Sequence, residues 1–263
     1  MVISLARRRI NMEETLKTEG IVIKSSRFKE NSKILTVLTQ RFGKINIMAQ
    51  GVMKPNSKAL AYSEVFSTSE FILKKGRNFY YIISADLINS HYFLRESIEK
   101  MAVGFYFLDL VDKSIPEEEI NIKIYNMLIV ALNNLEGREV DYIDLVLGFE
   151  LKLISLIGYK PYLVNCMDCH TNNSNSWYFD IEQGGILCSN CKTKESKYID
   201  YKHVNKMSRY ISLPFNELSN YTVNSEDKYK LHNLVYKYIQ TKLDIREIKS
   251  WNILKDLFEN SIT

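Results

Sequence analysis

The four cysteines of the chain all fall within residues 166–191, where they form two pairs. Each pair, Cys166 with Cys169 and Cys188 with Cys191, encloses two residues, and eighteen residues separate the pairs. Two intervening residues let a tight turn direct both thiolates at one ion, and two such turns complete a tetrahedral site. The spacing therefore predicts one bound Zn2+ with all four cysteines as ligands.

A site closed by four thiolates indicates a structural role for the metal. Catalytic zinc keeps one position open for water, whereas a closed shell puts the binding energy into folding. Two disulfides, four unrelated thiols, or His170 in place of one sulfur are the alternatives. Disulfides would require an oxidising compartment, but the three arginines at residues 7–9 are followed by polar Asn11, Glu13 and Glu14 instead of the apolar stretch of a secretory signal.

The charge of the chain is unevenly distributed. Residues 1–90 contain fifteen Lys and Arg against seven Asp and Glu, a net +8, whereas residues 91–263 contain twenty against twenty-four, a net −4. A basic first part is typical of a protein that binds an anionic partner, most commonly nucleic acid. No run approaches the roughly 18 apolar residues that cross a bilayer, so we expect a cytoplasmic protein without a membrane partner.

Residues 15–88 have the pattern of a small β-barrel. Short β-branched runs predict strands at residues 20–24, 33–39, 44–49, 64–73 and 79–83, with a hairpin loop at residues 74–78. Five short strands without a helix-length pattern favour a closed barrel of the oligonucleotide-binding (OB) type. Residues 1–14 have no clear period and are interpreted as an arm or an upstream start.

Residues 89–263 have a helical period. Apolar residues three and four apart predict helices at residues 90–113, 120–135, 142–157, 203–211 and 225–243, and one at residues 251–258 capped by Ser250. The cysteine segment, residues 162–200, interrupts this pattern as a module containing a hairpin. The predicted class is therefore α+β, with an OB-type barrel followed by an all-α domain that carries a zinc module.

The sequence contains no recognisable catalytic motif. Nucleotide-binding glycine loops, metalloprotease histidine pairs and the serine nucleophile elbow are all missing from it. A zinc deaminase would also need a His/Cys-x-Glu partner to its cysteine pair. A binding protein that is not an enzyme is therefore predicted.

Basic residues cluster in the turns of the predicted barrel, where they could follow a phosphate backbone without reading its sequence. The candidate DNA-binding residues are Lys24, Arg27, Lys29, Lys33, Arg41, Lys44, Lys54, Lys58, Lys74, Lys75 and Arg77. Phe28, Tyr80 and Tyr81 are the candidates for stacking on bases, although alternate aromatic residues in barrel strands also form cores.

Several segments in this order resemble the RecO family of bacterial repair and recombination mediators. They are TEGIVIK at residues 18–24, ENSKILT at 30–36, GVMKP at 51–55, GRN at 76–78, LIGYKP at 156–161, GGILC at 184–188 and REIKS at 246–250. The resemblance spans nearly the whole chain from Thr18. It implies an N-terminal OB barrel, a helical domain and a four-cysteine zinc module.

The resemblance also implies a function. RecO-like proteins bind single- and double-stranded DNA, anneal complementary strands, and together with RecR help to load RecA onto strands coated by single-strand-binding protein, whose C-terminal tail they engage. The resemblance therefore implies a location in the cytoplasm, at the nucleoid. Two other functions remain open from the residues alone: a protein–protein adaptor with no direct DNA role, and a zinc hydrolase or nuclease.

Overall fold

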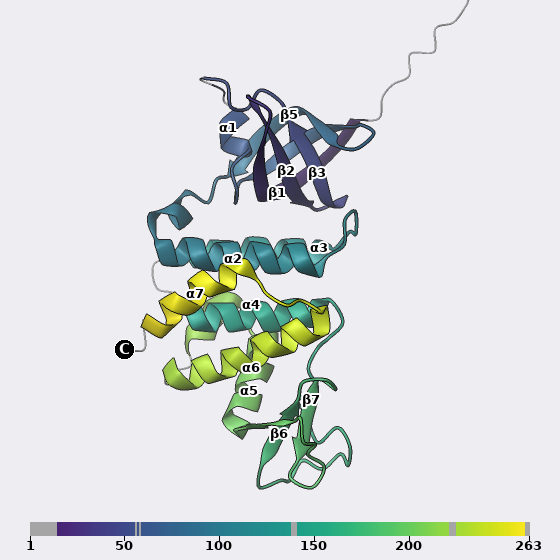
Figure 1. Ribbon diagram of the computed structural model, residues 1–263, viewed down its shortest axis with the longest axis vertical. Helices are drawn as coiled ribbons and strands as arrows, with labels where there is room; N and C mark the ends of the chain where they lie inside the picture. The colour runs from purple at the N-terminus through teal and green to yellow at the C-terminus, as the bar shows by residue number, and fades with distance from the viewer. Residues whose placement is uncertain (1–14, 56, 58, 138–140, 221–224, 261–263) are drawn as a thin grey trace, which may run out of the picture. The chain divides into compact units, whose positions relative to one another are not determined.

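The computed structural model describes residues 15–55, 57, 59–137, 141–220 and 225–260. The chain divides after Ser90 into two units, a β-barrel and a helical part (Figure 1). The α+β class and the barrel predicted from the sequence are confirmed. No helix among the described residues is long and apolar enough to cross a membrane.

Five strands close the barrel in the order β1-β2-β3-β5-β4. Their bounds are β1 Thr15–Phe28, β2 Ser32–Thr39, β3 Gly43–Ala49, β4 Thr68–Lys75 and β5 Tyr80–Asn89. The first half of β1 pairs with β4 and the second half with β2; Gly20 and Ile21 pair with both strands, and the β1–β2 register shifts between Val22 and Lys24. The barrel closes where β3 runs parallel to β5, in a register of two residue pairs, Ile47 with Tyr80 and Met48 with Tyr81.

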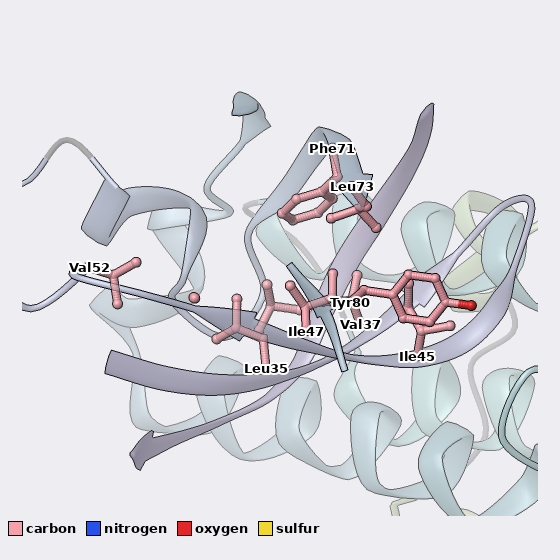
Figure 2. Packing of buried hydrophobic residues seen from close by; sticks show 10 residues of the cluster. Leu35, Val37, Ile45, Ile47, Val52, Phe71, Leu73 and Tyr80 are labelled. Carbon is pink, nitrogen blue, oxygen red and sulfur yellow. The ribbon is translucent and has the colours of Figure 1, made fainter. Parts of the chain in front are cut away.

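Alternating apolar residues fill the barrel because successive side chains of a strand point to opposite faces. Leu35 and Val37 on β2 and Ile47 on β3 are fully buried, and they pack with Phe71 and Leu73 of β4 (Figure 2). Burying one such side chain contributes about 1.5–3 kcal/mol. The interior is therefore a packed core, and ligand contacts must come from its outer face and turns.

The helical part is organised around an apolar helix. Its elements are the 3-10 helix η1 Tyr92–Glu96, α2 Ile98–Ser114, α3 Ile122–Glu136, α4 Tyr142–Leu156, α5 Tyr201–Ser212, the 3-10 helix η2 Phe215–Asn220, α6 Ser225–Leu243 and α7 Lys249–Asn260. Helix α4 contacts α2, α3, α5 and α6, and every residue from Ile143 to Leu151 is buried. Phe149 of α4 stacks on Phe107 of α2 with ring centroids 4.0 Å apart.

The metal module lies between α4 and α5 in the sequence and contains a sheet of three short strands in the order β7-β6-β8. They are β6 Trp177–Asp180, β7 Gly185–Cys188 and β8 Lys197–Ile199. The predicted hairpin at residues 177–187 is confirmed by the antiparallel pairing of β6 with β7.

Some predicted element bounds are wrong. The helix predicted over residues 90–113 is interrupted at Ser97, whose hydroxyl accepts a hydrogen bond from the Lys100 backbone N–H and so caps α2. The strand predicted from residue 64 begins at Thr68, and a short helix, α1 Ala59–Tyr62, precedes it. Ser250 lies inside α7, which already begins at Lys249.

Candidate nucleic-acid interface and metal centre

Three turns of the barrel unit enclose a surface groove of about 620 Å³. They connect β1 with β2, β3 with α1, and β4 with β5. The residues that line the groove are Phe28, Lys29, Asn31, Ser32, Met48, Gln50, Gly51, Lys54, Arg77, Asn78, Phe79 and Tyr81. One recess thus combines cationic side chains, aromatic rings and amides.

The groove contains three of the predicted DNA-binding cations, Lys29, Lys54 and Arg77, and all three are exposed. Lys29 has a left-handed backbone, with φ of 55°, and its Nζ lies 5.4 Å from the centroid of the Phe28 ring. Gly51 also has positive φ, 69°, which glycine adopts without strain, and the Lys54 stem lies within van der Waals distance of it, 3.6 Å from where a Cβ would stand. The turns therefore place cations beside an aromatic ring.

Five further predicted cations lie on the barrel but do not line the groove. Among them, Arg41 donates from Nη1 to the Lys17 carbonyl at 3.3 Å, and Lys75 Nζ lies 5.4 Å from the Tyr80 ring centroid. All five are at least partly exposed: Lys24, Arg27, Arg41, Lys74 and Lys75. Their contribution to DNA binding remains a prediction.

Three candidate residues are buried, so the expectation that they present a charge or a ring to DNA is corrected. Lys33 is 8% exposed and its Nζ lies 2.7 Å from Glu64 Oε1, and Lys44 is 7% exposed. Tyr80 is 7% exposed and belongs to the barrel core. Strand alternation places Lys33 on the face of β2 that carries buried Leu35 and Val37, and it places Tyr80 on the inward face of β5. Lys58 lies outside the described residues.

The other two stacking candidates, Phe28 and Tyr81, both line the groove, and Tyr81 is 36% exposed. Tyr81 follows buried Tyr80 on β5, so the alternation of the strand decides which of the two faces outward. The sequence analysis did not select the amides Asn31, Gln50 and Asn78, which also line the groove. Their positions inside the same three turns were the available signal.

The second candidate site is the cysteine cluster. The Sγ atoms of Cys166, Cys169, Cys188 and Cys191 all lie within 4.8 Å of one another, and those of Cys169 and Cys188 are 3.7 Å apart. Four sulfurs bound at about 2.3 Å to one tetrahedral ion lie about 3.8 Å from each other. The donor set therefore fits a single metal ion, and His170 is not part of the group.

Backbone hydrogen bonds hold the two cysteine turns. His170 N–H donates to the Cys166 carbonyl at 3.0 Å, Cys191 N–H donates to the Cys188 carbonyl at 3.2 Å, and Cys188 N–H donates to Cys166 Sγ at 3.4 Å. Burial raises the pKa of the Cys166 thiol, but N–H groups of Cys169, Cys188 and Asp168 lower it, to about 6 overall. The turns thus favour a thiolate, the form that binds metal, at Cys166. At Cys191 the pKa is raised instead, chiefly because its thiol hydrogen-bonds to the Asp168 side chain.

The β6–β7 turn docks onto helix α6 through Gly184. Its φ is 82°, and a Cβ there would lie 2.6 Å from the Tyr238 hydroxyl, which donates to the Tyr159 carbonyl at 2.8 Å. We therefore expect Gly184→Ala to lower the free energy of unfolding by about 2 kcal/mol or more, from left-handed strain plus the clash. Gly158→Ala is the matched control in thermal unfolding, because its φ is 98° but nothing lies near its Cβ. Equal losses would show that the clash is unimportant.

The helical part also buries charged groups that the sequence reading did not single out. Asp144 on α4 is fully buried; its Oδ2 lies 2.6 Å from Lys228 Nζ, and its Oδ1 lies 3.3 Å from Lys206 Nζ and accepts from the Tyr210 hydroxyl. Burial lowers the pKa of Lys206, and Asp144 partly offsets this effect. The network therefore joins α4, α5 and α6.

A second buried group lies two turns further along α4. Glu150 is fully buried, accepts from the Tyr106 hydroxyl, and lies 2.9 Å from His232 Nε2. The Trp251 ring stacks on His232 with centroids 4.4 Å apart. The sequence signal for both networks was the presence of these two carboxylates in a mostly apolar helix.

Two family models match the chain, and each covers most of one of its two units. The family model described as "Recombination protein O C terminal" matches residues 95–252, and "Recombination protein O N terminal" matches residues 12–91. The chain belongs to the RecO family. The two RecO matches meet between residues 91 and 95, close to the division after Ser90.

Curated RecO relatives align over almost the full chain. The DNA repair protein RecO of Alkaliphilus metalliredigens is 31% identical over 244 residues, which are 92% of this chain and 99% of the relative. The protein of the same name from Desulforamulus reducens is 30% identical over 249 residues, 94% and 96% of the two chains. That from Thermoanaerobacter sp. is 28% identical over 244 residues, 92% and 98%. The resemblance seen in the sequence is thereby confirmed.

Proposed function

We propose that this chain binds single- and double-stranded DNA, anneals complementary strands, and helps to load a recombinase onto strands covered by single-strand-binding protein. Membership of the RecO family supports the general role in DNA repair and recombination. The observation that carries the finer proposal is the groove, because it combines Lys29, Lys54 and Arg77 with the rings of Phe28 and Tyr81.

Binding of this kind needs no catalysis. Cations in the groove can hold the phosphates of one strand, aromatic rings can stack on its bases, and neutralised phosphates repel a complementary strand less strongly. Pairing of the two strands then supplies the free energy of annealing, so the chain acts as a mediator and not as an enzyme. The proposed partners are RecR and the C-terminal tail of single-strand-binding protein, and RecA is the recombinase. Such a role belongs in the cytoplasm, at the nucleoid.

We propose that the ion of the cysteine cluster is Zn2+. Four thiolates and tetrahedral spacing suit zinc, whose structural sites are closed in this way. This ion would stabilise the module, and four sulfurs would leave it no open position for activating water. Metal analysis of the purified chain would test the identity of the ion. The nuclease alternative has a separate test, because it requires strand cleavage that depends on the metal.

The groove is tested by replacing its three cations together, as Lys29→Ala, Lys54→Ala and Arg77→Ala. Each single-strand phosphate contact contributes about −0.7 to the slope of log affinity against log salt, so the triple variant should lose about 2 from the magnitude of that slope. Fluorescence anisotropy with labelled oligonucleotides between about 50 and 200 mM salt measures it. We also expect the variant to anneal complementary strands more slowly.

The matched control replaces three exposed lysines of the helical part, Lys113, Lys123 and Lys160, with alanine. It removes the same number of charges and should leave the salt slope almost unchanged. A folded groove variant that binds and anneals like the original chain would exclude the groove and favour the adaptor. If the anisotropy of the labelled oligonucleotides did not change on addition of the unaltered chain at low salt, the DNA-binding proposal would be refuted.

A further inference from the structure

The metal module carries an aromatic pair on its surface. Tyr178 of β6 and Tyr198 of β8 are cross-strand partners, and their ring centroids are 6.0 Å apart at an interplanar angle of 79°. Tyr198 is 66% exposed, although a large ring on a small sheet is usually covered by its own fold. The sheet therefore offers an aromatic surface to a ligand.

A lysine is fixed against this pair by the metal site itself. Lys192 directly follows the ligand Cys191, its Nζ lies 4.7 Å from the centroid of the Tyr178 ring, and it donates to the Tyr178 hydroxyl at 3.3 Å. The other end of the cluster is tied to the same sheet, because Cys188 of β7 pairs with Trp177 of β6. The two cysteine turns thus adjoin this cation and these rings.

A groove of about 550 Å³ extends from Tyr198 between β8, α5 and α6. Four lysines line it, Lys197, Lys202, Lys230 and Lys237, against the two carboxylates Asp200 and Asp227. Lys202 is engaged by both carboxylates, at 3.7 Å and 2.8 Å. Lys197 and Lys237 are exposed and have no ion pair within the described ranges. The groove therefore retains a positive surplus beside an exposed ring.

We propose that this face, Tyr178, Lys192, Tyr198, Lys197 and Lys237, is a second contact for single-stranded DNA. The inference rests on the proposed annealing function: the barrel groove accounts for one strand, and a chain that also holds the second strand brings the two together faster. Unpaired bases can stack on the Tyr198 ring while the lysines contact the flanking phosphates. Duplex DNA is disfavoured because its bases are already stacked on each other.

Photocrosslinking of the full metal-bound chain tests the location directly. A single-stranded oligonucleotide with 5-iododeoxyuridine at several positions, irradiated at saturating concentration, should crosslink to peptides containing Tyr178 or Tyr198 as well as to barrel peptides. Crosslinks confined to the barrel would overturn the second contact and leave the proposed function intact. Crosslinks confined to the metal module would instead sustain the second contact and refute the barrel groove.

Tyr198→Ala provides the functional readout. Loss of one stacked base should slow annealing by about tenfold at limiting protein. The affinity for the first strand, held by the barrel groove and measured by anisotropy, should stay within about twofold. The bound metal should remain at one ion per chain. Tyr198→Phe keeps the ring and should anneal like the original chain. Unchanged annealing by Tyr198→Ala, or equal losses in both variants, would overturn the stacking role.

Discussion

Replacing Asp144 with alanine is expected to destabilise the helical part by about 3–5 kcal/mol. Asp144 is fully buried and faces the ammonium groups of Lys206 and Lys228, which are 6% and 5% exposed. Its removal leaves two buried positive charges without their shared partner, and the Tyr210 hydroxyl without its acceptor. Chemical denaturation followed by circular dichroism measures the loss.

Asp141→Ala is the matched control for this experiment. Its carboxylate also contacts Lys228, at 2.5 Å, and caps α4 by accepting from the Asp144 N–H at 3.0 Å, but its side chain is 39% exposed, so we expect a loss of about 1–2 kcal/mol. A triple variant, Asp144→Leu with Lys206→Met and Lys228→Met, should recover much of the stability, because its three buried charges are replaced by apolar groups. Similar losses for Asp144→Ala and Asp141→Ala would contradict the importance of burial.

Removing the metal should unfold the cysteine module. Structural zinc contributes on the order of 10 kcal/mol to small domains, whereas strands of four, four and three residues cannot hold a sheet alone. In Cys188→Ser, or after chelation, amide hydrogen exchange should lose its protection in residues 162–200. The barrel core, which shares no residue with the module, should keep its protection.

The control for the metal variant is His170→Asn, adjacent to Cys169. The His170 backbone is left-handed, with φ of 59°, and asparagine tolerates this conformation better than most residues. One bound ion per chain and unchanged exchange are expected. Metal loss in this variant would indicate that the imidazole is a ligand, and a Cys188→Ser variant that keeps both its ion and full protection would refute the four-thiolate site.

Local sequence patterns were sufficient to predict the barrel and the grouping of the four cysteines. Two-residue spacing within each cysteine pair already determines the turn geometry, and short β-branched runs predicted the strands at residues 33–39 and 44–49. The sequence did not decide which of Tyr80 and Tyr81 faces outward. It also did not show that Lys33 and Lys44 are buried. Which face of a strand points inward depends on pairing partners that are distant in the sequence.

The buried networks escaped prediction for a related reason. Asp144 and Glu150 gain their partners only when α5 brings Lys206, and α6 brings Lys228 and His232, to them from 62 to 84 residues away along the chain. The groove, by contrast, could be predicted in part from the sequence, because its cations lie in turns. Which turns converge is a property of barrel closure and not of any one segment.

The closure of the barrel lies directly at the groove. Met48 and Tyr81, one of the two residue pairs that join β3 to β5, both line it. A strand of DNA bound there would span the shortest seam of the barrel, and a ligand that binds only the closed form adds its binding free energy to folding. Bound single-stranded DNA would then stabilise the pairing of β3 with β5. Without DNA, this pairing would open more readily than the rest of the barrel.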